Sequence, residues 1–510
     1  MRQAMAQPWI QKCLLHLEAP AEDRTDDVSR CAAALAEAGF PGARLPLPLV
    51  QARFPALREA HCTATLVRDA GETVVTDLEP GDTTAHLYGA AVDLGSTTVV
   101  LRLMDTVTGE TLAETTRRNG QRAYGDEILS RIFYAKDSPE RRAELQAVTA
   151  ETIRALLEEA CAAAGLTADD ISAMVVSGNT VMTHFLLGLD TFCLFHTPFC
   201  PVLSRPGTVE AERLGLGFRG AVYCFPATAN YLGGDIISGL LHTGLTQREE
   251  TSLFLDIGTN GEMVLGNREY LIGGAGAAGP ALEGGISASG MRAKEGAVDA
   301  VIIENGALRC SVIGGGKPRG ICGSGIVDLL AQMLLAGWID RAGTLQSEKS
   351  SRIRTLEGRL VVVYADETES ATGKPLYFAQ EDIRQFTETK AAAYTMVAVL
   401  LDTAGLTLDQ VDRIYLAGAF GRHLNLESAI TIGLYPDAPR EKFRVVGNSS
   451  LEGACELLRG GVSPEEADRV AQEIYYLEFA MQETFVEEMR AATFYPHTDL
   501  ALYPTVAAKL

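Results

Sequence analysis

The chain has 510 residues, of which 66 are Asp or Glu and 44 are Lys or Arg, so its formal net charge is −22. This acidity argues against the phosphate backbone of a nucleic acid as a main partner, because surfaces that bind it are basic. The length allows about three domains. A content of 47% apolar residues with 50 glycines is typical of a globular α/β protein.

The first segment, residues 1–86, has the pattern of a small α+β domain. Residues 1–12 lack the apolar region of a signal peptide, so we expect a cytoplasmic protein without a membrane-spanning helix. The predicted elements follow in this order: an apolar run at 9–17, a helix at 25–38, a second helix around 49–57, and strands at 61–67 and 72–78. The turn-rich residues 79–84 mark the boundary of this domain.

The ten cysteines are scattered at positions 13, 31, 62, 161, 193, 200, 224, 310, 322 and 455, and none forms a CxxC pair. An iron–sulfur cluster of the ferredoxin type needs several thiolates in one tight loop, and a zinc site needs similarly close ligands. Only Cys193 and Cys200 lie near each other in the sequence. We therefore expect reduced, mostly buried thiols and no iron–sulfur cluster.

From residue 87 on, the sequence repeats itself. Residues 90–103 (AAVDLGSTTVVLRL) and 253–265 (LFLDIGTNGEMVL) share an apolar strand, an Asp, a Gly, small polar residues and a second strand. Residues 165–178 and 405–418 also match, and each follows a long helical stretch, at 139–164 and 381–404. Two halves with the same parts in the same order predict a duplicated α/β lobe, with a longer insertion at about 265–380 in the second copy.

The two strand–turn–strand motifs are typical of phosphate binding. A glycine lets backbone N–H groups approach an anion, a carboxylate such as Asp93 or Asp256 holds a hydrated divalent cation, and hydroxyls donate to phosphate. One copy is weak evidence, because Asp-Gly turns are common structural features, but two copies favour a nucleotide gripped from both sides. The turn residues are Gly95, Ser96, Thr97, Thr98, Gly258, Thr259 and Asn260.

These hairpins resemble the two phosphate motifs of the superfamily of acetate and sugar kinases, heat-shock chaperones and actin. Residues 176–180 (VSGNT) resemble its first connecting motif, and residues 416–421 (LAGAFG) resemble its adenosine motif. The Gly cluster at 323–325 fits a nucleotide site or a helix cap. The resemblance implies contacts with ATP through Gly178, Asn179, Gly323, Ser324, Gly325, Gly418, Ala419 and Phe420.

Asp235 is the candidate carboxylate for orienting the attacking water. It follows Gly233 and Gly234 and lies about 20 residues before the second phosphate strand, a spacing similar to that of the chaperone ATPases. Phosphoryl transfer depends mostly on positioning and charge stabilisation, so one such carboxylate is expected. The alternative is that Asp235 only caps the helix that begins there. The sequence leaves both interpretations open.

Within the superfamily, the chain resembles the ATP-dependent reductive activators of corrinoid proteins. The motifs that carry this resemblance occur in the same order, from about residue 79 to the C-terminus, and residues 1–86 are similar to that family's small middle domain. Asn119, Gln121 and Arg131 belong to the first of these motifs, but a solvated polar face explains them equally well. The motifs are residues 119–131, 176–184, 230–236, 290–293, 416–421 and 447–454.

Such activators usually begin with a ferredoxin-like domain that holds a [2Fe–2S] cluster. This sequence starts where that domain would end, so we expect electrons to come from a separate ferredoxin-like donor. The resemblance implies that ATP returns a corrinoid partner from the cob(II)amide to the cob(I)amide state.

We therefore predict an actin-like ATPase fold of two duplicated RNase H-like lobes, with domains at 1–86, 87–248 and 249–510. A return of the C-terminal segment to the first lobe stays open. ATP and Mg²⁺ are the expected cofactors, with Asp93 and Asp256 as metal ligands and Asp93, Asp235 and Asp256 as catalytic residues. The expected partners are a corrinoid protein and the electron donor. The alternatives are a small-molecule kinase and a nucleotide-binding module without hydrolysis, and a homodimer is left open.

Overall fold

The computed structural model describes residues 8–20, 24–258, 261–276 and 285–510, and the side chains of residues 419, 420 and 422 lie outside this description. The contacts divide the chain into two units, each with its own core. The first unit comprises Met1–Gly244 and Ser449–Ile474, and the second comprises Leu245–Asn448 and Tyr475–Leu510. The three-domain division at 1–86, 87–248 and 249–510 stays a prediction.

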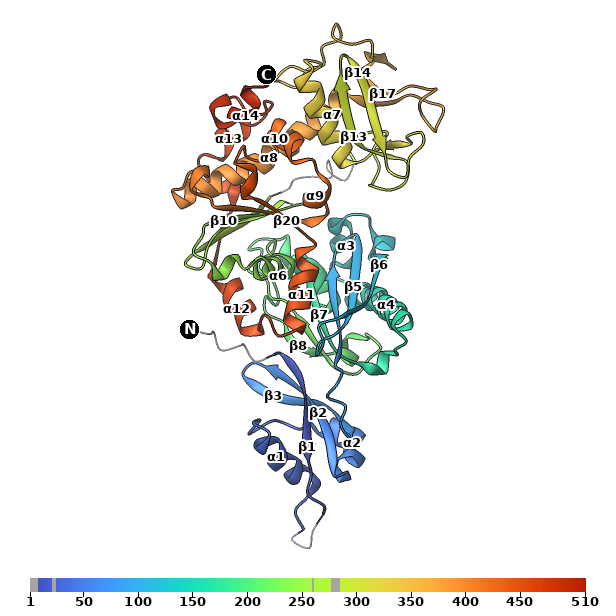
Figure 1. Cartoon of the computed structure of the whole chain (residues 1–510), viewed down its shortest axis with the longest axis vertical. Helices are drawn as coiled ribbons and strands as arrows, with labels where there is room; N and C mark the ends of the chain where they lie inside the picture. Colours follow the sequence, from blue (N-terminus) through green and yellow to red (C-terminus); the bar gives the residue numbers. More distant parts are fainter. Residues whose placement is uncertain (1–7, 21–23, 259–260, 277–284) are drawn as a thin grey trace. The chain divides into compact units, whose positions relative to one another are not determined.

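The first unit begins with a small antiparallel sheet covered by two helices (Figure 1). Its elements are β1 (Ile10–His16), α1 (Asp27–Glu37), α2 (Leu47–Arg53), β2 (His61–Asp69) and β3 (Glu72–Pro80), in the sheet order β1-β2-β3. Asp26 caps α1 by accepting a hydrogen bond from the Ser29 N–H, and the helix buries Cys31, Ala34 and Leu35 against the sheet core.

A six-stranded mixed sheet follows in the first unit, in the order β6-β5-β4-β7-β9-β8. Strand β4 pairs antiparallel with β5 and parallel with β7, which in turn is parallel to β9. The strands are β4 (Tyr88–Leu94), β5 (Thr98–Asp105), β6 (Thr111–Arg118), β7 (Ile171–Gly178), β8 (Gly207–Glu210) and β9 (Ala221–Cys224). Because β4, β7 and β9 are parallel, their carboxyl ends meet at one edge of the sheet.

Helices cover both faces of this sheet (Figure 1). Helix α4 packs on β5 and β6, whereas α11 packs on β4 and β7 and against α6. The helices of this unit are α3 (Ile128–Ala135), α4 (Pro139–Ala164), α5 (Thr180–Leu186), α6 (Gly234–Thr243), α11 (Ser449–Leu458) and α12 (Pro464–Glu473). Helices α11 and α12 thus return to the first unit from a distant part of the sequence.

The second unit repeats the same strand pattern. Its six-stranded sheet has the order β20-β19-β10-β11-β12-β21, in which β10 is antiparallel to β11 and parallel to β19. The strands are β10 (Ser252–Ile257), β11 (Gly261–Gly266), β12 (Leu271–Gly276), β19 (Arg413–Ala417), β20 (Phe443–Gly447) and β21 (Ile474–Tyr476). The predicted duplicated α/β lobes of the actin-like ATPase fold are therefore confirmed.

The end of the long helix explains why the residues that follow it are similar in the two copies. Helix α4 ends at Gly165 with φ 73°, and α8 (Gln380–Ala404) ends at Gly405 with φ 65°. This left-handed conformation is one that glycine adopts without strain. A capping box then follows in both copies, because the Thr167 N–H donates to Asp170 and the Thr407 N–H donates to Gln410.

The insertion of the second unit contains two small three-stranded sheets around α7. Its elements are β13 (Ala297–Glu304), β14 (Ala307–Val312), β15 (Gly320–Ile321), α7 (Gly323–Leu335), β16 (Ile353–Leu356), β17 (Arg359–Ala365) and β18 (Leu376–Ala379). The remaining helices of this unit are α9 (Gly418–His423), α10 (Leu426–Thr431), α13 (Phe485–Ala491) and α14 (Pro504–Ala507).

In the described part of the chain, no helix combines the length and apolarity that crossing a bilayer requires.

Candidate functional site

The first phosphate hairpin is the tight turn between β4 and β5. Asp93 is the second-to-last residue of β4 and is partly buried. Its Oδ1 accepts a hydrogen bond of 2.8 Å from the Ser450 hydroxyl. A Cβ atom on Gly95 would lie 2.4 Å from the Thr98 carbonyl oxygen, so only glycine fits this turn. The predicted residues Gly95, Ser96, Thr97 and Thr98 therefore form one turn beside the Asp93 carboxylate.

Two other predicted residues, Gly178 and Asn179, lie at the same edge of the first unit. A Cβ on Gly178, at the end of β7, would lie 2.8 Å from the Leu94 carbonyl oxygen, so β7 approaches the hairpin closely. Asn179 caps α5 through a 2.9 Å hydrogen bond from the Met182 N–H to its Oδ1. A Cβ on Gly233 would lie 2.5 Å from Asn179 Cα, which places the start of α6 against this turn.

Asp235 lies in the first turn of α6, but it does not cap the helix. The N-cap residue is Gly233, and Asp235 Oδ1 accepts a 3.0 Å hydrogen bond from the neighbouring Ile236 N–H. Asp235 is therefore not the N-cap residue itself, although its carboxylate still accepts a hydrogen bond from a first-turn N–H. The carboxylate is partly buried and belongs to the same unit as Asp93.

A buried polar network supports the first hairpin from behind. Asn119 Nδ2 donates to the Gly95 carbonyl oxygen at 2.9 Å, and Arg131 Nη1 donates to the Ser96 carbonyl oxygen at 2.7 Å. Asn119, Gln121 and Arg131 are at most 1% exposed, so the interpretation as a solvated polar face is wrong. Burial lowers the pKa of Arg131 to about 10. These side chains fix the carbonyl groups of the phosphate turn.

The second hairpin lies between β10 and β11 in the second unit. Asp256 is partly buried near the end of β10, and Gly258 follows the strand, whereas Thr259 and Asn260 lie outside the described residues. Strand β19 runs parallel to β10 and ends just before Gly418. A Cβ on Gly418 would lie 2.6 Å from Asp256 Oδ1, so the second hairpin and the adenosine motif meet at this point.

The residues predicted to contact the adenosine lie on two short stretches of the second unit. Gly418, Ala419 and Phe420 form the start of α9, although the side chains of the last two are outside the description. Gly323, Ser324 and Gly325 form the first turn of α7, which contacts α9. A Cβ on Gly325 would lie 2.3 Å from the Val298 carbonyl oxygen, so close packing on β13 already explains that glycine.

Each unit thus combines a strand-end carboxylate with a nearby glycine that has no room for a Cβ atom, Gly95 in the first unit and Gly418 in the second. Carboxylate oxygens suit a hydrated Mg²⁺, and turns without Cβ atoms suit close approach of phosphate to the backbone. Among the described residues, no group of three or more His, Cys, Asp or Glu residues is arranged to hold a metal ion. Asp93 and Asp256 belong to different units, so whether they share a metal ion stays a prediction.

The cysteines form no disulfides. All ten are free thiols, six of them buried, and Cys200 is the exposed one. Burial raises the pKa of Cys224 and Cys310 to about 12, which makes these thiols unreactive near neutral pH.

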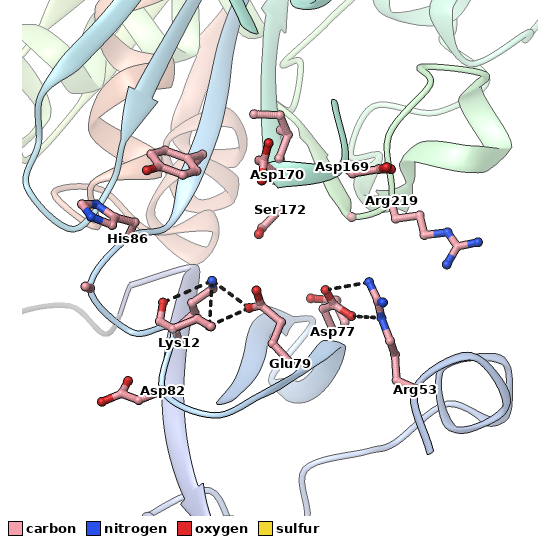
Figure 2. Close-up of a pocket in the computed structure, with 16 residues that line it drawn as sticks. Lys12, Arg53, Asp77, Glu79, Asp82, His86, Asp169, Asp170, Ser172 and Arg219 are labelled. Atoms are coloured by element: carbon pink, nitrogen blue, oxygen red, sulfur yellow. Dashed lines mark hydrogen bonds and ion pairs between the residues drawn. The ribbon is translucent and has the colours of Figure 1, made fainter. Parts of the chain in front are cut away.

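A cavity of about 640 Å³ lies within the first unit, between the small domain and the sheet (Figure 2). Figure 2 shows Lys12 directed at Glu79 and Arg53 directed at Asp77, and these ion pairs measure 2.7 and 2.8 Å. The third basic residue, Arg219, pairs with Glu212 at 3.3 Å. Carboxylates outnumber basic groups in the lining: Asp77, Glu79, Asp82, Asp169 and Asp170 against Lys12, Arg53 and Arg219. None of the predicted site residues lines this cavity, and its charge does not favour a nucleotide.

Three family models cover nearly the whole chain. The model described as the C-terminal domain of RACo, the ASKHA domain, matches residues 250–507, the RACo middle region matches 88–248, and the RACo linker region matches 1–85. This chain belongs to RACo, the family of reductive activators of corrinoid proteins. The resemblance noted from the motifs is confirmed. Within the RACo family, residues 1–85 match the linker and not the middle region, which corrects the expected similarity of residues 1–86.

Individual RACo relatives cover most of the chain. The corrinoid activation enzyme RamQ of Eubacterium limosum is 31% identical over 82% of this chain and 72% of its own length. The [Co(II) methylated amine-specific corrinoid protein] reductase of Methanosarcina barkeri is 24% identical over 78% of this chain and 75% of its own length. A solved structure of a reductive activator for corrinoid, iron-sulfur protein is 37% identical, with a TM-score of 0.86 over 99% of this chain and 82% of that one.

Proposed function

We propose that this protein binds ATP with Mg²⁺, hydrolyses it, and thereby drives reduction of a corrinoid protein from the cob(II)amide to the cob(I)amide state. One electron per cobalt is needed, and a separate ferredoxin-like protein supplies it. The observation that carries the proposal is that each unit places a strand-end carboxylate near a glycine with no room for a Cβ atom, Gly95 in the turn after Asp93 and Gly418 beside Asp256. Membership of the RACo family and the names of its relatives support the corrinoid partner.

In this proposal, each unit contributes one hairpin to the same nucleotide. Asp93 and Asp256 hold the hydrated Mg²⁺, which when bound offsets charge on the phosphates. The turns after them donate backbone N–H groups to phosphate oxygens, and Asp235 accepts a hydrogen bond from the attacking water and orients it. The adenosine is held by the turns 323–325 and 418–420. Because the protein is acidic overall, binding depends on N–H groups and Mg²⁺ and not on basic side chains.

Phosphate release in the presence of a corrinoid protein tests this function. The purified chain is mixed with ATP and with a corrinoid protein in the cob(II)amide state, and the same partner in the methylcob(III)amide state serves as the control. We expect faster phosphate release with the cob(II)amide form, and the cob(I)amide absorption spectrum only when ATP and an external reductant are both present. Tight ATP binding without phosphate release, or transfer of phosphate to a metabolite, would contradict the proposal.

The Gly418→Ala substitution tests the nucleotide site in the second unit. The new Cβ would lie 2.6 Å from Asp256 Oδ1, so the carboxylate must move away from its position. We expect Mg²⁺-dependent affinity for ATP to fall at least about tenfold, which is about 1.4 kcal/mol, as measured by titration calorimetry.

Gly405→Ala is the matched control, since Gly405 has φ 65° against 75° at Gly418 and no atom lies within 4 Å of its Cβ position. Both variants therefore incur the strain of a left-handed alanine, about 1 kcal/mol, but only Gly418→Ala reaches Asp256. Equal ATP affinities in the two variants would argue against a nucleotide site at Asp256.

A further inference from the structure

Three buried hydroxyl groups connect Asp93 with the helix that carries Asp235. Ser450 Oγ lies 2.8 Å from Asp93 Oδ1 and 2.9 Å from Ser177 Oγ. Ser177 Oγ lies 2.7 Å from Ser238 Oγ, which in turn lies 3.0 Å from the carbonyl oxygen of Asp235. All of these residues belong to the first unit.

The carboxylate determines the direction of these hydrogen bonds. An ionised carboxylate only accepts, so the single hydroxyl proton of Ser450 goes to Asp93. Ser177 must then donate to Ser450. Ser238 donates either to Ser177 or to the Asp235 carbonyl. A hydroxyl chain of this kind ends on Asp93 with a charge-assisted hydrogen bond, which is stronger than one between neutral groups.

Because the three serine hydroxyl groups are buried, the loss of any one of them affects the hydrogen bonds of the others. Ser177 and Ser238 are 0% exposed and Ser450 is 8% exposed, so water does not replace a missing partner readily. Each serine comes from a different element: Ser177 precedes Gly178 on β7, Ser238 lies one turn after Asp235 on α6, and Ser450 is the second residue of α11. Three elements far apart in the sequence therefore meet behind the first hairpin.

We propose that Ser450, Ser177 and Ser238 are positioning residues, which hold the Asp93 carboxylate in the orientation that binds Mg²⁺ and keep the first turn of α6 in register with it. This inference rests on the proposed function, since it concerns the same nucleotide site. The hydrogen bond from Ser450 restrains the orientation of the Asp93 carboxylate. The serines themselves contact neither metal nor nucleotide.

The test is the Mg²⁺ dependence of nucleotide affinity, measured with a fluorescent ATP analogue, together with ATP turnover. For Ser450→Ala we expect the Mg²⁺ concentration for half-maximal affinity to rise about tenfold, in line with loss of a hydrogen bond to a charged group. Ser177→Ala should shift it in the same direction by less, because it acts through Ser450. Ser450→Thr keeps the hydroxyl and should restore the wild-type Mg²⁺ dependence.

Thr115→Val is the matched control. Thr115 is 7% exposed in the same unit, and its hydroxyl donates to the Leu156 carbonyl oxygen at 3.1 Å, so the variant loses a buried hydrogen bond to a backbone carbonyl group and not to a carboxylate. It should lower the melting temperature and leave the Mg²⁺ dependence unchanged. If Ser450→Ala behaves in the same way while the wild type binds and hydrolyses ATP, the positioning role is wrong and the proposed function stands. If the wild type binds no Mg²⁺-nucleotide, both fail.

Discussion

The Asp235→Asn variant should lose at least about a hundredfold in ATP turnover, the lower end of what a positioned acid or base contributes. Asparagine has the same shape as aspartate and keeps an oxygen for the Ile236 N–H, so the first turn of α6 should be preserved. The substitution removes the negative charge, which in the proposed function orients the attacking water, and replaces one oxygen by an NH₂ group. Nucleotide affinity and melting temperature should therefore stay near those of the wild type, as measured by titration calorimetry and thermal denaturation.

Glu140→Gln is the matched control for Asp235→Asn. Glu140 is a carboxylate in the first turn of α4, in the same unit, and it is exposed beside Ser138. Neutralising it removes a similar favourable interaction with the helix N-terminus, but it should leave turnover unchanged. Turnover by Asp235→Asn within twofold of the wild type would show that this carboxylate does not orient the water.

The Trp9→Ala variant should destabilise the first unit by about 3 to 5 kcal/mol, the usual cost of removing a buried aromatic side chain. Trp9 is 0% exposed, although it precedes β1 near the start of the chain. Its Nε1 donates to Thr208 Oγ1 at 3.4 Å, and its ring lies 5.8 Å from that of Tyr223. It therefore attaches the small domain to the sheet of the first unit.

The two tryptophans of the chain allow the unfolding of the two units to be followed separately. Trp338 belongs to the second unit and is 2% exposed, so in Trp9→Ala its fluorescence follows the second unit alone. We expect the circular dichroism transition of the first unit to shift to lower urea while the Trp338 transition stays in place. Trp9→Phe keeps most of the apolar contact and should shift the transition of the first unit far less. A Trp9→Ala transition equal to that of the wild type would exclude this anchoring role.

Much of the fold could be predicted because its signals are local. The pattern at 139–164 predicts a helix with the bounds that α4 has, since Ser138, Pro139 and Gly165 mark its ends. The strand–turn–strand motifs are local as well, because a turn of few residues allows only certain residue types. Duplication then strengthened the prediction, since the same pattern of Gly, Thr and an acid or amide occurs after both long helices.

The supports of the candidate site could not be predicted in the same way. Arg131 looks like an exposed basic residue until the Ser96 carbonyl group is found beside it. Ser450 lies 357 positions from Asp93, and no local pattern connects them. Asp235 was ambiguous because a first-turn aspartate fits either a cap or a functional carboxylate, and only the backbone shows that Gly233 is the N-cap residue. Long-range contacts of this kind depend on the completed fold.

The return of residues 449–474 to the first unit has a consequence for synthesis of the protein. A chain emerging from the ribosome in N-to-C order has made all strands of the first six-stranded sheet by residue 224, yet it still lacks α11 and α12. The face of α6 that α11 covers, where a Cβ on Gly453 would lie 2.2 Å from the Ser238 carbonyl oxygen, stays open until then. The second unit needs residues 475–510. The first unit therefore cannot complete its fold before residue 474 has been translated, and the second cannot do so before residues 475–510 follow.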